Sequence, residues 1–401
     1  EGFTTSASAA TGSNQTITFD TLGEGTYTGK TVTVTDAAGN AGSITMADFV
    51  IDTTVPTAAI TYSSTGPYKQ NDAVTITATF TEAMATTPKI AISGVSSIAA
   101  TNMSGSGTTW TYAYTAPAGD GTETIALSAG TDASGNTVTS APTSGATFTV
   151  DNTAPTLTAV TQVSTPNNDN TPSYVFTTNE AGTITTNITE GFTTSASAAT
   201  GSNQTITFDT LGEGTYTGKT VTVTDAYGNA GSITMADFVI DTTAPTMTIV
   251  STTTGVTDGS TTNDSSIVLR FTASQATSNF VANDITVTGG TISNFASTSS
   301  TVYTATFTPS GDGATTVDVA ANKFTDAAGN NNTAADQFNW TYDGTAPTMT
   351  INSTTSGVTD GSTTNDSSIS MVFVSSEATS NFAASDISVS NGTLSSFTTV
   401  S

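Results

Sequence analysis

The fold is decided by a stretch that recurs in the sequence, TVTVTDAYGNAGSITMADFVIDTTAP at residues 220–245. It opens with alternating Thr and Val, turns at Asp225-Ala-Tyr-Gly-Asn229, and closes with an apolar segment that runs into a proline. Alternation with a period of two is typical of a strand with one buried face, and Gly between Asp and Asn favours a tight turn. The stretch therefore predicts a β-hairpin that leads into a short, stiff linker.

The same hairpin and linker recur along the chain. Residues 1–54 are repeated at 190–243 with a single change, Ala38 to Tyr227. The linker signature D-x-T-x-P returns at intervals of roughly 100 residues, which is the size of one immunoglobulin-type β-sandwich. It begins at Asp52, Asp151, Asp241 and Asp343.

The composition agrees with an all-β protein, because Thr and Val favour strands while Gly and Asn favour turns. No segment has a sustained helical period. We therefore predict tandem immunoglobulin-like β-sandwich domains arranged as an extended rod. The expected parts are the C-terminal part of a domain at 1–52, whole domains at 53–151, 152–241 and 242–343, and the N-terminal part of a domain at 344–401.

The charge balance limits the partners. The formal net charge is −26, because 32 Asp and Glu stand against 6 Lys and Arg. Such a surface repels the phosphates of nucleic acids and anionic lipid headgroups. No apolar run reaches the length of about 18 residues needed to span a bilayer. We expect no nucleic-acid partner and no membrane insertion of this segment.

The absent residue types argue against an enzyme. The sequence has no Cys and no His, so a thiolate nucleophile and an imidazole base are both excluded. A pair of carboxylates could still hydrolyse a glycosidic bond. The acids, however, repeat domain by domain, which suits junctions between domains better than a single catalytic site.

Three acids are expected to meet at each linker. In an immunoglobulin-like sandwich, the loop between the last two strands and the end of the second strand lie at the pole where the preceding domain enters. The D-x-x-G-N turn contributes one Asp there, the second strand ends in a Glu, and the linker adds its own Asp. The two complete sets are Asp52, Glu82 and Asp132, and Asp151, Glu180 and Asp225. Because such carboxylates repel one another, the sets predict Ca²⁺, which accepts six to eight oxygen ligands.

The other junctions depart from this pattern. At the third, Asp241 and Asp326 are present but Gln275 replaces the Glu, so we expect a weaker or differently built site there, helped by Asp284. The fourth retains two of the acids, Asp343 and Glu377. The alternative interpretation of all these acids is a set of solvated turns, in which Asp and Asn brace the hairpin through side-chain hydrogen bonds.

These residues resemble a known family. A strand ending in an acid, a D-x-x-G-N turn and an apolar strand that runs into D-x-T-x-P are similar to the bacterial immunoglobulin-like domains in the stalks of large Gram-negative surface adhesins. That group includes repeats-in-toxin adhesins secreted by type I systems. Residues 283–291 are similar to one of its subgroups. The resemblance implies Ca²⁺ at the junctions, a rigid rod and a location at the cell surface. It does not imply a target.

We therefore predict a structural spacer in a bacterial surface adhesin, whose partners are the neighbouring repeats of the same chain. One alternative is a subunit of a self-assembling extracellular filament or sheath, in which other copies are partners. A second is a carbohydrate-binding module, which would need clustered exposed aromatic residues. The two tryptophans, Trp110 and Trp340, lie in different predicted domains within alternating strand patterns, so we expect both in cores.

Overall fold

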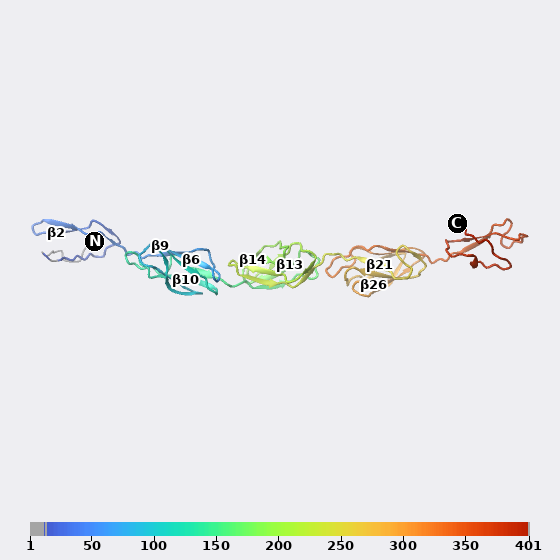
Figure 1. The fold of residues 1–401 in the computed structure, drawn as a ribbon, viewed down its shortest axis with the longest axis horizontal. Helices are drawn as coiled ribbons and strands as arrows, with labels where there is room; N and C mark the ends of the chain where they lie inside the picture. Colours follow the sequence, from blue (N-terminus) through green and yellow to red (C-terminus); the bar gives the residue numbers. More distant parts are fainter. Residues whose placement is uncertain (1–11, 13, 400–401) are drawn as a thin grey trace. The chain divides into compact units, whose positions relative to one another are not determined.

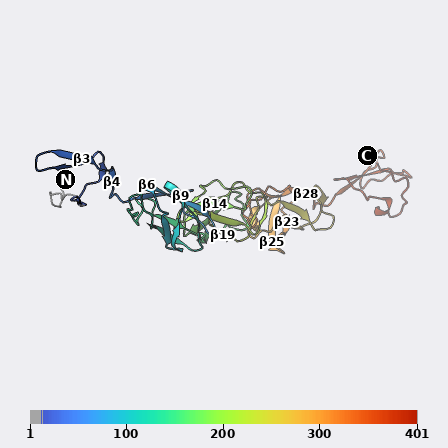
Figure 2. The ribbon, with the colours of Figure 1, turned by 60° about the vertical axis from the view of Figure 1, so that its left-hand side comes forward.

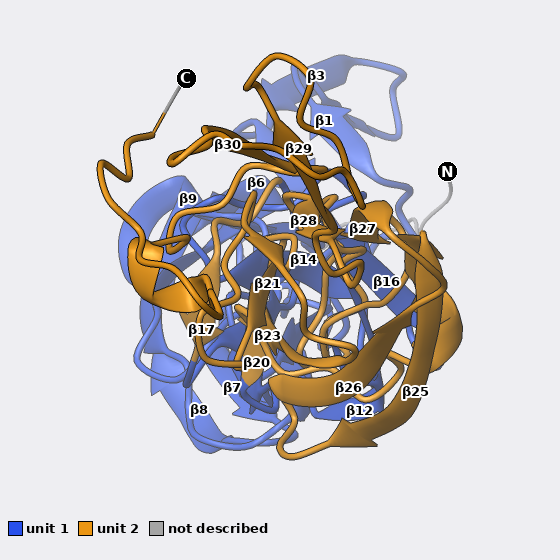
Figure 3. Ribbon diagram, turned by 90° about the vertical axis from the view of Figure 1, so that its right-hand side faces the viewer, with its two compact units in different colours: residues 1–163, 173–209, 217–237 blue, residues 164–172, 210–216, 238–401 orange. Residues whose placement is uncertain are grey.

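The computed structural model describes residues 12 and 14–399, and its regular structure is β-strand apart from two short 3₁₀ turns, η1 (Ala282–Asp284) and η2 (Ala384–Asp386) (Figure 1). Among the described residues, no helix has the length and apolar character needed to cross a membrane. The chain divides into two compact units (Figure 3). The first holds residues 1–163, 173–209 and 217–237, and the second holds 164–172, 210–216 and 238–401.

This division runs through the predicted domain 152–241, whose boundaries remain a prediction. Each sheet nevertheless draws its strands from within one predicted domain. The fold class is confirmed: the protein is all-β and is built from tandem immunoglobulin-like sandwiches.

The first unit contains a complete sandwich at residues 53–151. One sheet has the order β5-β6-β9, of which β6 and β9 are labelled in Figure 2, and the other has the order β11-β10-β7-β8. The strands of the first sheet are β5 (Ala58–Tyr62), β6 (Ala73–Met84) and β9 (Ser104–Thr115). Those of the second are β7 (Lys89–Ser93), β8 (Ser97–Asn102), β10 (Gly121–Ser128) and β11 (Thr147–Val150).

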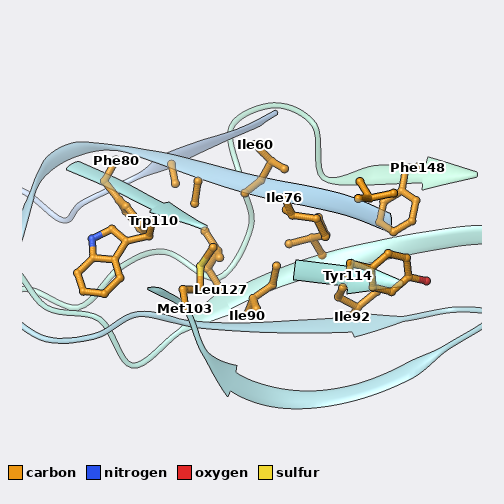
Figure 4. Packing of buried hydrophobic residues seen from close by; sticks show 14 of the residues in the cluster. Ile60, Ile76, Phe80, Ile90, Ile92, Met103, Trp110, Tyr114, Leu127 and Phe148 are labelled. Carbon is orange, nitrogen blue, oxygen red and sulfur yellow. The ribbon is translucent and has the colours of Figure 1, made fainter. Parts of the chain in front are cut away.

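The alternation along β6 produces the core of this sandwich. Val74, Ile76, Ala78 and Phe80 are buried, and the residues between them face away. They meet buried residues of the opposite sheet, among them Ile90, Ile92, Leu127 and Phe148 (Figure 4). Trp110 packs in the same core with 8% of its surface exposed, and Trp340 is 2% exposed in another, so the prediction that both are core residues is confirmed.

Two further sheets of the first unit have the orders β12-β13-β16 and β15-β14-β18-β19. Their strands are β12 (Leu157–Thr161), β13 (Ser173–Thr178), β14 (Gly182–Thr186), β15 (Ser197–Ala198), β16 (Gln204–Thr207), β18 (Thr220–Thr224) and β19 (Ala230–Thr234). The remaining pairs are β1-β4 and β2-β3, formed by β1 (Gly25–Tyr27), β2 (Thr31–Thr35), β3 (Ala41–Thr45) and β4 (Phe49–Ile51).

The second unit holds the sandwich at residues 242–343, with sheet orders β21-β23-β26-β25 and β22-β28-β27-β24. Its strands are β21 (Met247–Ser251), β22 (Thr261–Thr262), β23 (Ile267–Ala273), β24 (Ile285–Thr288), β25 (Gly290–Ser297), β26 (Val302–Pro309), β27 (Gly313–Val319) and β28 (Phe338–Tyr342). Two smaller pairs also belong to this unit: β17 (Gly214–Tyr216) with β20 (Phe238–Ile240), and β29 (Met349–Ser353) with β30 (Met371–Ser375).

The sandwiches differ in one edge strand. At residues 242–343, β25 pairs with β26 and gives the sheet the order of an immunoglobulin constant domain. At residues 53–151, the corresponding β8 pairs instead with β7 in the other sheet. The chain leaves β24 through Gly289, whose φ of +73° suits glycine and redirects β25 away from its predecessor.

The repeated hairpin has the same sequence in two environments. Val223 on β18 is fully buried, whereas its counterpart Val34 on β2 is 52% exposed. In the second copy, β14 pairs with β18, while β2 pairs only with β3 among the described strands. The difference in burial therefore comes from neighbouring strands and not from the local sequence.

Candidate metal centres at the linkers

Each D-x-x-G-N motif forms a turn that is complete in itself. In the turn at Asp132, one carboxylate oxygen accepts hydrogen bonds from the backbone N–H groups of Ser134 (2.8 Å) and Asn136 (2.9 Å). The other oxygen accepts the Asn136 side-chain amide at 2.9 Å. The exposed turn at Asp36 repeats this arrangement with Ala38 and Asn40. The interpretation of the motif as a braced hairpin is thus correct.

The same Asn also fastens the turn to the preceding linker. Its side-chain amide donates to the main-chain carbonyl of the linker Asp, in addition to bracing its own turn. The distances are 3.0 Å from Asn136 to Asp52, 3.1 Å from Asn229 to Asp151 and 2.7 Å from Asn330 to Asp241. The hairpin and the linker are therefore adjacent at all three junctions, as the topology predicts.

Two carboxylate triads form at the positions expected from the sequence. In each, carboxylate oxygens from three different segments lie within 4.8 Å of one another. The segments are the linker, the end of the second strand and the turn before the last strand. The triads are Asp52, Glu82 and Asp132, and Asp151, Glu180 and Asp225. The turn Asp is buried in both, at 4% exposure for Asp132 and 8% for Asp225.

The three negative charges in the first triad repel one another. Burial raises the pKa of Glu82, and the negative charges of Asp52, Asp132 and Glu24 raise it further. Burial also raises the pKa of Asp132, but hydrogen bonds from Asn136 and the turn backbone outweigh it, so the net pKa of Asp132 is lowered. The ionised form of Glu82 is consequently disfavoured, whereas that of Asp132 is favoured.

The pKa of the Glu in the second triad is shifted in the same direction as that of Glu82. Burial raises the pKa of Glu180, followed by the charges of Asp151, Asp225 and Asp120, while a hydrogen bond from Asn179 acts in the opposite direction. Two equivalent sites with the same imbalance point to a common requirement for positive charge.

One atom of the first triad lacks a partner. Oε1 of Glu82 is buried and has no hydrogen-bond donor. An unpaired buried carboxylate oxygen is costly, and it needs either a donor or a cation. The donor set of three carboxylates with nearby main-chain carbonyls is all oxygen, which fits a hard cation such as Ca²⁺.

The third junction is built differently. Gln275 occupies the position of the Glu, and its amide nitrogen donates to the carbonyl of Thr243 at 2.9 Å. Asp241 and Asp326 are joined only through Asn330, which contacts both. Asp284, expected as a helper, lies in η1, where its carboxylate accepts a hydrogen bond from the backbone N–H of Val281.

The fourth junction remains a prediction. The carboxylate of Asp343 accepts the backbone N–H of Thr345 at 3.3 Å. Glu377 is exposed, and its own backbone N–H donates to Ser375.

A second set of acids forms hydrogen bonds with the linkers. We did not predict this role from the sequence. These acids stand between two glycines in every repeat and accept hydrogen bonds from the linker residues that follow the Asp. Asp120 accepts the backbone N–H of Asn152 at 2.5 Å, and Glu213 accepts the hydroxyl of Thr243 at 2.7 Å. The four members are Glu24, Asp120, Glu213 and Asp312. The recurring Gly-acid-Gly motif is the signal that could have revealed them.

Hydrogen bonds from the linker favour the ionised form of Asp120, Glu213 and Asp312. The pKa of Asp120 is lowered, first by the Thr153 hydroxyl, and the pKa of Glu213 is lowered, first by the Thr243 hydroxyl. The pKa of Asp312 is lowered in the same way by Thr345. Each of the first three linkers is thus held by an acid of the domain before it and by an Asn of the domain after it.

Comparisons with known proteins agree with this architecture. Residues 241–342 match a family model described as a bacterial Ig-like domain, which spans one of the predicted whole domains together with its leading linker Asp. No curated protein matches the sequence. The class is thus a tandem immunoglobulin-like β-sandwich protein, and residues 241–342 of it are similar to bacterial Ig-like domains.

Solved structures with similar folds have low sequence identity. A marsupial T cell receptor is 12% identical with a TM-score of 0.29, covering 72% of this chain and 99% of that one. Invasin, a bacterial integrin-binding protein, is 15% identical with a TM-score of 0.29, covering 75% and 62%. The BSP domain of a biofilm-associated protein is 12% identical with a TM-score of 0.19, covering 73% and 67%. The chain therefore spans less than two thirds of the invasin structure.

Proposed function

We propose that this chain is a structural spacer of a bacterial cell-surface adhesin, located outside the cell and stiffened by calcium between its domains. The observation that carries the proposal is the pair of carboxylate triads at successive linkers, one of which contains the buried, unpartnered Oε1 of Glu82. The match of residues 241–342 to bacterial Ig-like domains supports the bacterial surface context.

Calcium would be held by Asp52, Glu82 and Asp132 at the first junction and by Asp151, Glu180 and Asp225 at the second. Bound there, the ion supplies positive charge that offsets the repulsion among the three carboxylates. The partial sets Asp241 with Asp326, and Asp343 with Glu377, are the remaining candidate ligands predicted from the sequence.

The mechanism is mechanical rather than catalytic. Contacts between neighbouring domains in one chain are small, so such junctions bend by default. A cation shared by the linker Asp, the second strand and the hairpin turn ties the linker to two separate parts of the next domain. The protein's own residues already orient this linker, through Asn136 on one side and Glu24 on the other. Calcium would convert an oriented joint into a rigid one, and the array into an extended rod.

Small-angle scattering of the whole chain tests this proposal, with millimolar calcium and again with excess chelator. We expect a longer, narrower distribution of distances with calcium. The variant carrying Glu82→Gln and Glu180→Gln should lose most of the response, since each triad loses one charged ligand. Asp336→Asn is the control, because Asp336 is exposed and lies outside the triads.

Calorimetric titration of the same samples counts the bound ions. Equal dimensions in both buffers and no heat of binding would contradict the proposal and favour the alternative of a filament subunit, which self-association measurements would then examine. The carbohydrate-binding alternative gains no support from the tryptophans, because Trp110 and Trp340 are both buried and offer no exposed platform for sugar rings.

A further inference from the structure

The junctions share their framework and differ at one position. In each of the first three, the turn Asn donates to the carbonyl of the linker Asp, and a Gly-flanked acid holds the linker residues that follow. The variable position comes at the end of the second strand of the next domain. It is occupied by Glu82, Glu180 and Gln275 in turn.

Glu and Gln differ in the hydrogen bonds that they can form with the linker. An ionised Glu offers only acceptors, whereas the amide group of Gln also offers two N–H donors. Gln275 uses this capacity directly, since its nitrogen donates to the main-chain carbonyl of Thr243 at 2.9 Å. A Glu at that position would place one acceptor against another and would need a cation or a proton between them.

The charges remaining at the third junction are already satisfied by the protein. One carboxylate oxygen of Asp326 accepts three backbone N–H groups of its own turn, from Ala328, Gly329 and Asn330, at 2.8–2.9 Å. Its other oxygen accepts the Asn330 side chain at 2.9 Å. The carboxylate of Asp241 accepts the backbone N–H of Thr243 at 3.1 Å. The linker and turn Asp of the first junction accept equivalent hydrogen bonds, so the junctions differ in the third acid, which Gln275 replaces.

We infer that the residue at the end of the second strand determines whether a junction requires a cation, and that Gln275 closes the third junction without one. The inference rests on the proposed function for the first two junctions. The array then contains two kinds of joint. Those with Glu82 and Glu180 stiffen only with calcium, and the joint with Gln275 is stiff in its absence.

Spin-label distances across individual linkers in the whole chain test the inference. The chain has no cysteine, so labels attach only where cysteines are introduced. One pair replaces Thr75 and Thr185 across the second linker, and another replaces Thr185 and Thr308 across the third; all three residues are exposed. On chelation of calcium, the distance distribution of the first pair should broaden severalfold, while that of the second pair should keep its width.

Two substitutions of Gln275 distinguish the effect of its side-chain amide from the effect of the rest of the junction. Gln275→Glu should make the distance distribution of the pair across the third linker, Thr185 and Thr308, broad in chelator and narrow in calcium, and should add one calcium ion to the number bound. Gln275→Leu removes the hydrogen bond without adding charge, so this pair should be broad in both buffers. Near-ultraviolet circular dichroism, which reports on the packing of aromatic side chains, checks that both variants are folded.

The outcomes distinguish the two claims. If both linkers broaden on chelation in the parent chain, the inference about Gln275 is overturned while calcium stiffening stands. If neither responds and no calcium binds, the proposed function falls and the inference falls with it. If Gln275→Glu gains no dependence on calcium, the end of the second strand is not the determinant.

Discussion

At the scale of the residue, two buried tyrosines show that the effect of a hydroxyl group on stability depends on whether it has a hydrogen-bond partner. Tyr114 donates to Oε1 of the fully buried Glu123 at 2.8 Å, and burial raises the pKa of Tyr114 to about 12. The hydroxyl of Tyr174 is equally buried but has no hydrogen-bond partner. Tyr114 lies in β9 and Tyr174 in β13, and each is in the interior of its own sandwich, so the two can be compared by the same substitution.

The tyrosine pair gives opposite predictions for the same change. Tyr174→Phe should raise the free energy of unfolding by about 1 kcal/mol, because it removes a buried polar group that nothing satisfies. Tyr114→Phe should lower it by about 1–3 kcal/mol, because it leaves Glu123 buried with one donor fewer. Denaturant unfolding monitored by fluorescence measures both. A loss of stability in Tyr174→Phe would mean that its hydroxyl has a partner in solution.

The glutamates of the triads predict an unusual dependence on pH. The folded-state pKa values of Glu82 and Glu180 are raised above those of the unfolded chain, so the folded state binds protons more readily. Their contribution to stability is therefore present at low pH and is lost as the pH rises through the folded-state pKa.

In chelator, the melting temperature should thus increase as the pH falls from about 7 towards about 5, and the Glu82→Gln, Glu180→Gln variant should lack this increase. Calcium should remove it in the parent chain, because the cation favours the ionised form. Scanning calorimetry across this range measures the effect. A parent chain whose stability in chelator falls steadily with acidification would contradict the assignment.

At the scale of the element, the repeated hairpin separates what the local sequence determines from what the surroundings determine. Strands β2 and β18 have the same sequence and the same pairing with the following strand, in the same register. Their burial differs because β14 lies beside β18. Local patterning forms the hairpin, and long-range pairing buries it.

Hydrogen exchange should report this difference directly. The amides of β18 and β19 should exchange at least tenfold more slowly than those of β2 and β3, since opening them requires separation from the rest of the sheet. Mass spectrometry can distinguish the two copies because Tyr227 replaces Ala38 in the turn between the strands. Equal rates would mean that β2 and β3 are covered in solution.

The same comparison explains how much could be predicted. The period-two pattern at residues 220–224 identified β18, and the position of each acid relative to a strand end was enough to predict both triads. Alternation does not tell which sheet an edge strand joins, so the different pairing of β8 and β25 could not be predicted. The recurrence of the Gly-acid-Gly motif could have singled out Asp120, but its partner Asn152 is 32 residues away, and the motif alone does not identify that contact.

At the scale of the whole molecule, the distribution of charge and the choice of junction residues act together. The net charge of −26 includes the triad acids, so calcium at two junctions would neutralise charge where it is most concentrated. The third junction needs no such compensation under our inference, because Gln275 replaces one of the three acids. The response of the chain to calcium would then be local, confined to certain linkers.

The double attachment of each linker has a consequence for rotation. The first linker residue is held by the domain ahead, as Asp151 is by Asn229, and the next residues are held by the domain behind, as Asn152 is by Asp120. Few backbone torsions between these attachments are free to turn. Where a joint is closed, by calcium at the second linker or by Gln275 at the third under our proposals, a twist applied to one domain would be passed to the next instead of being absorbed.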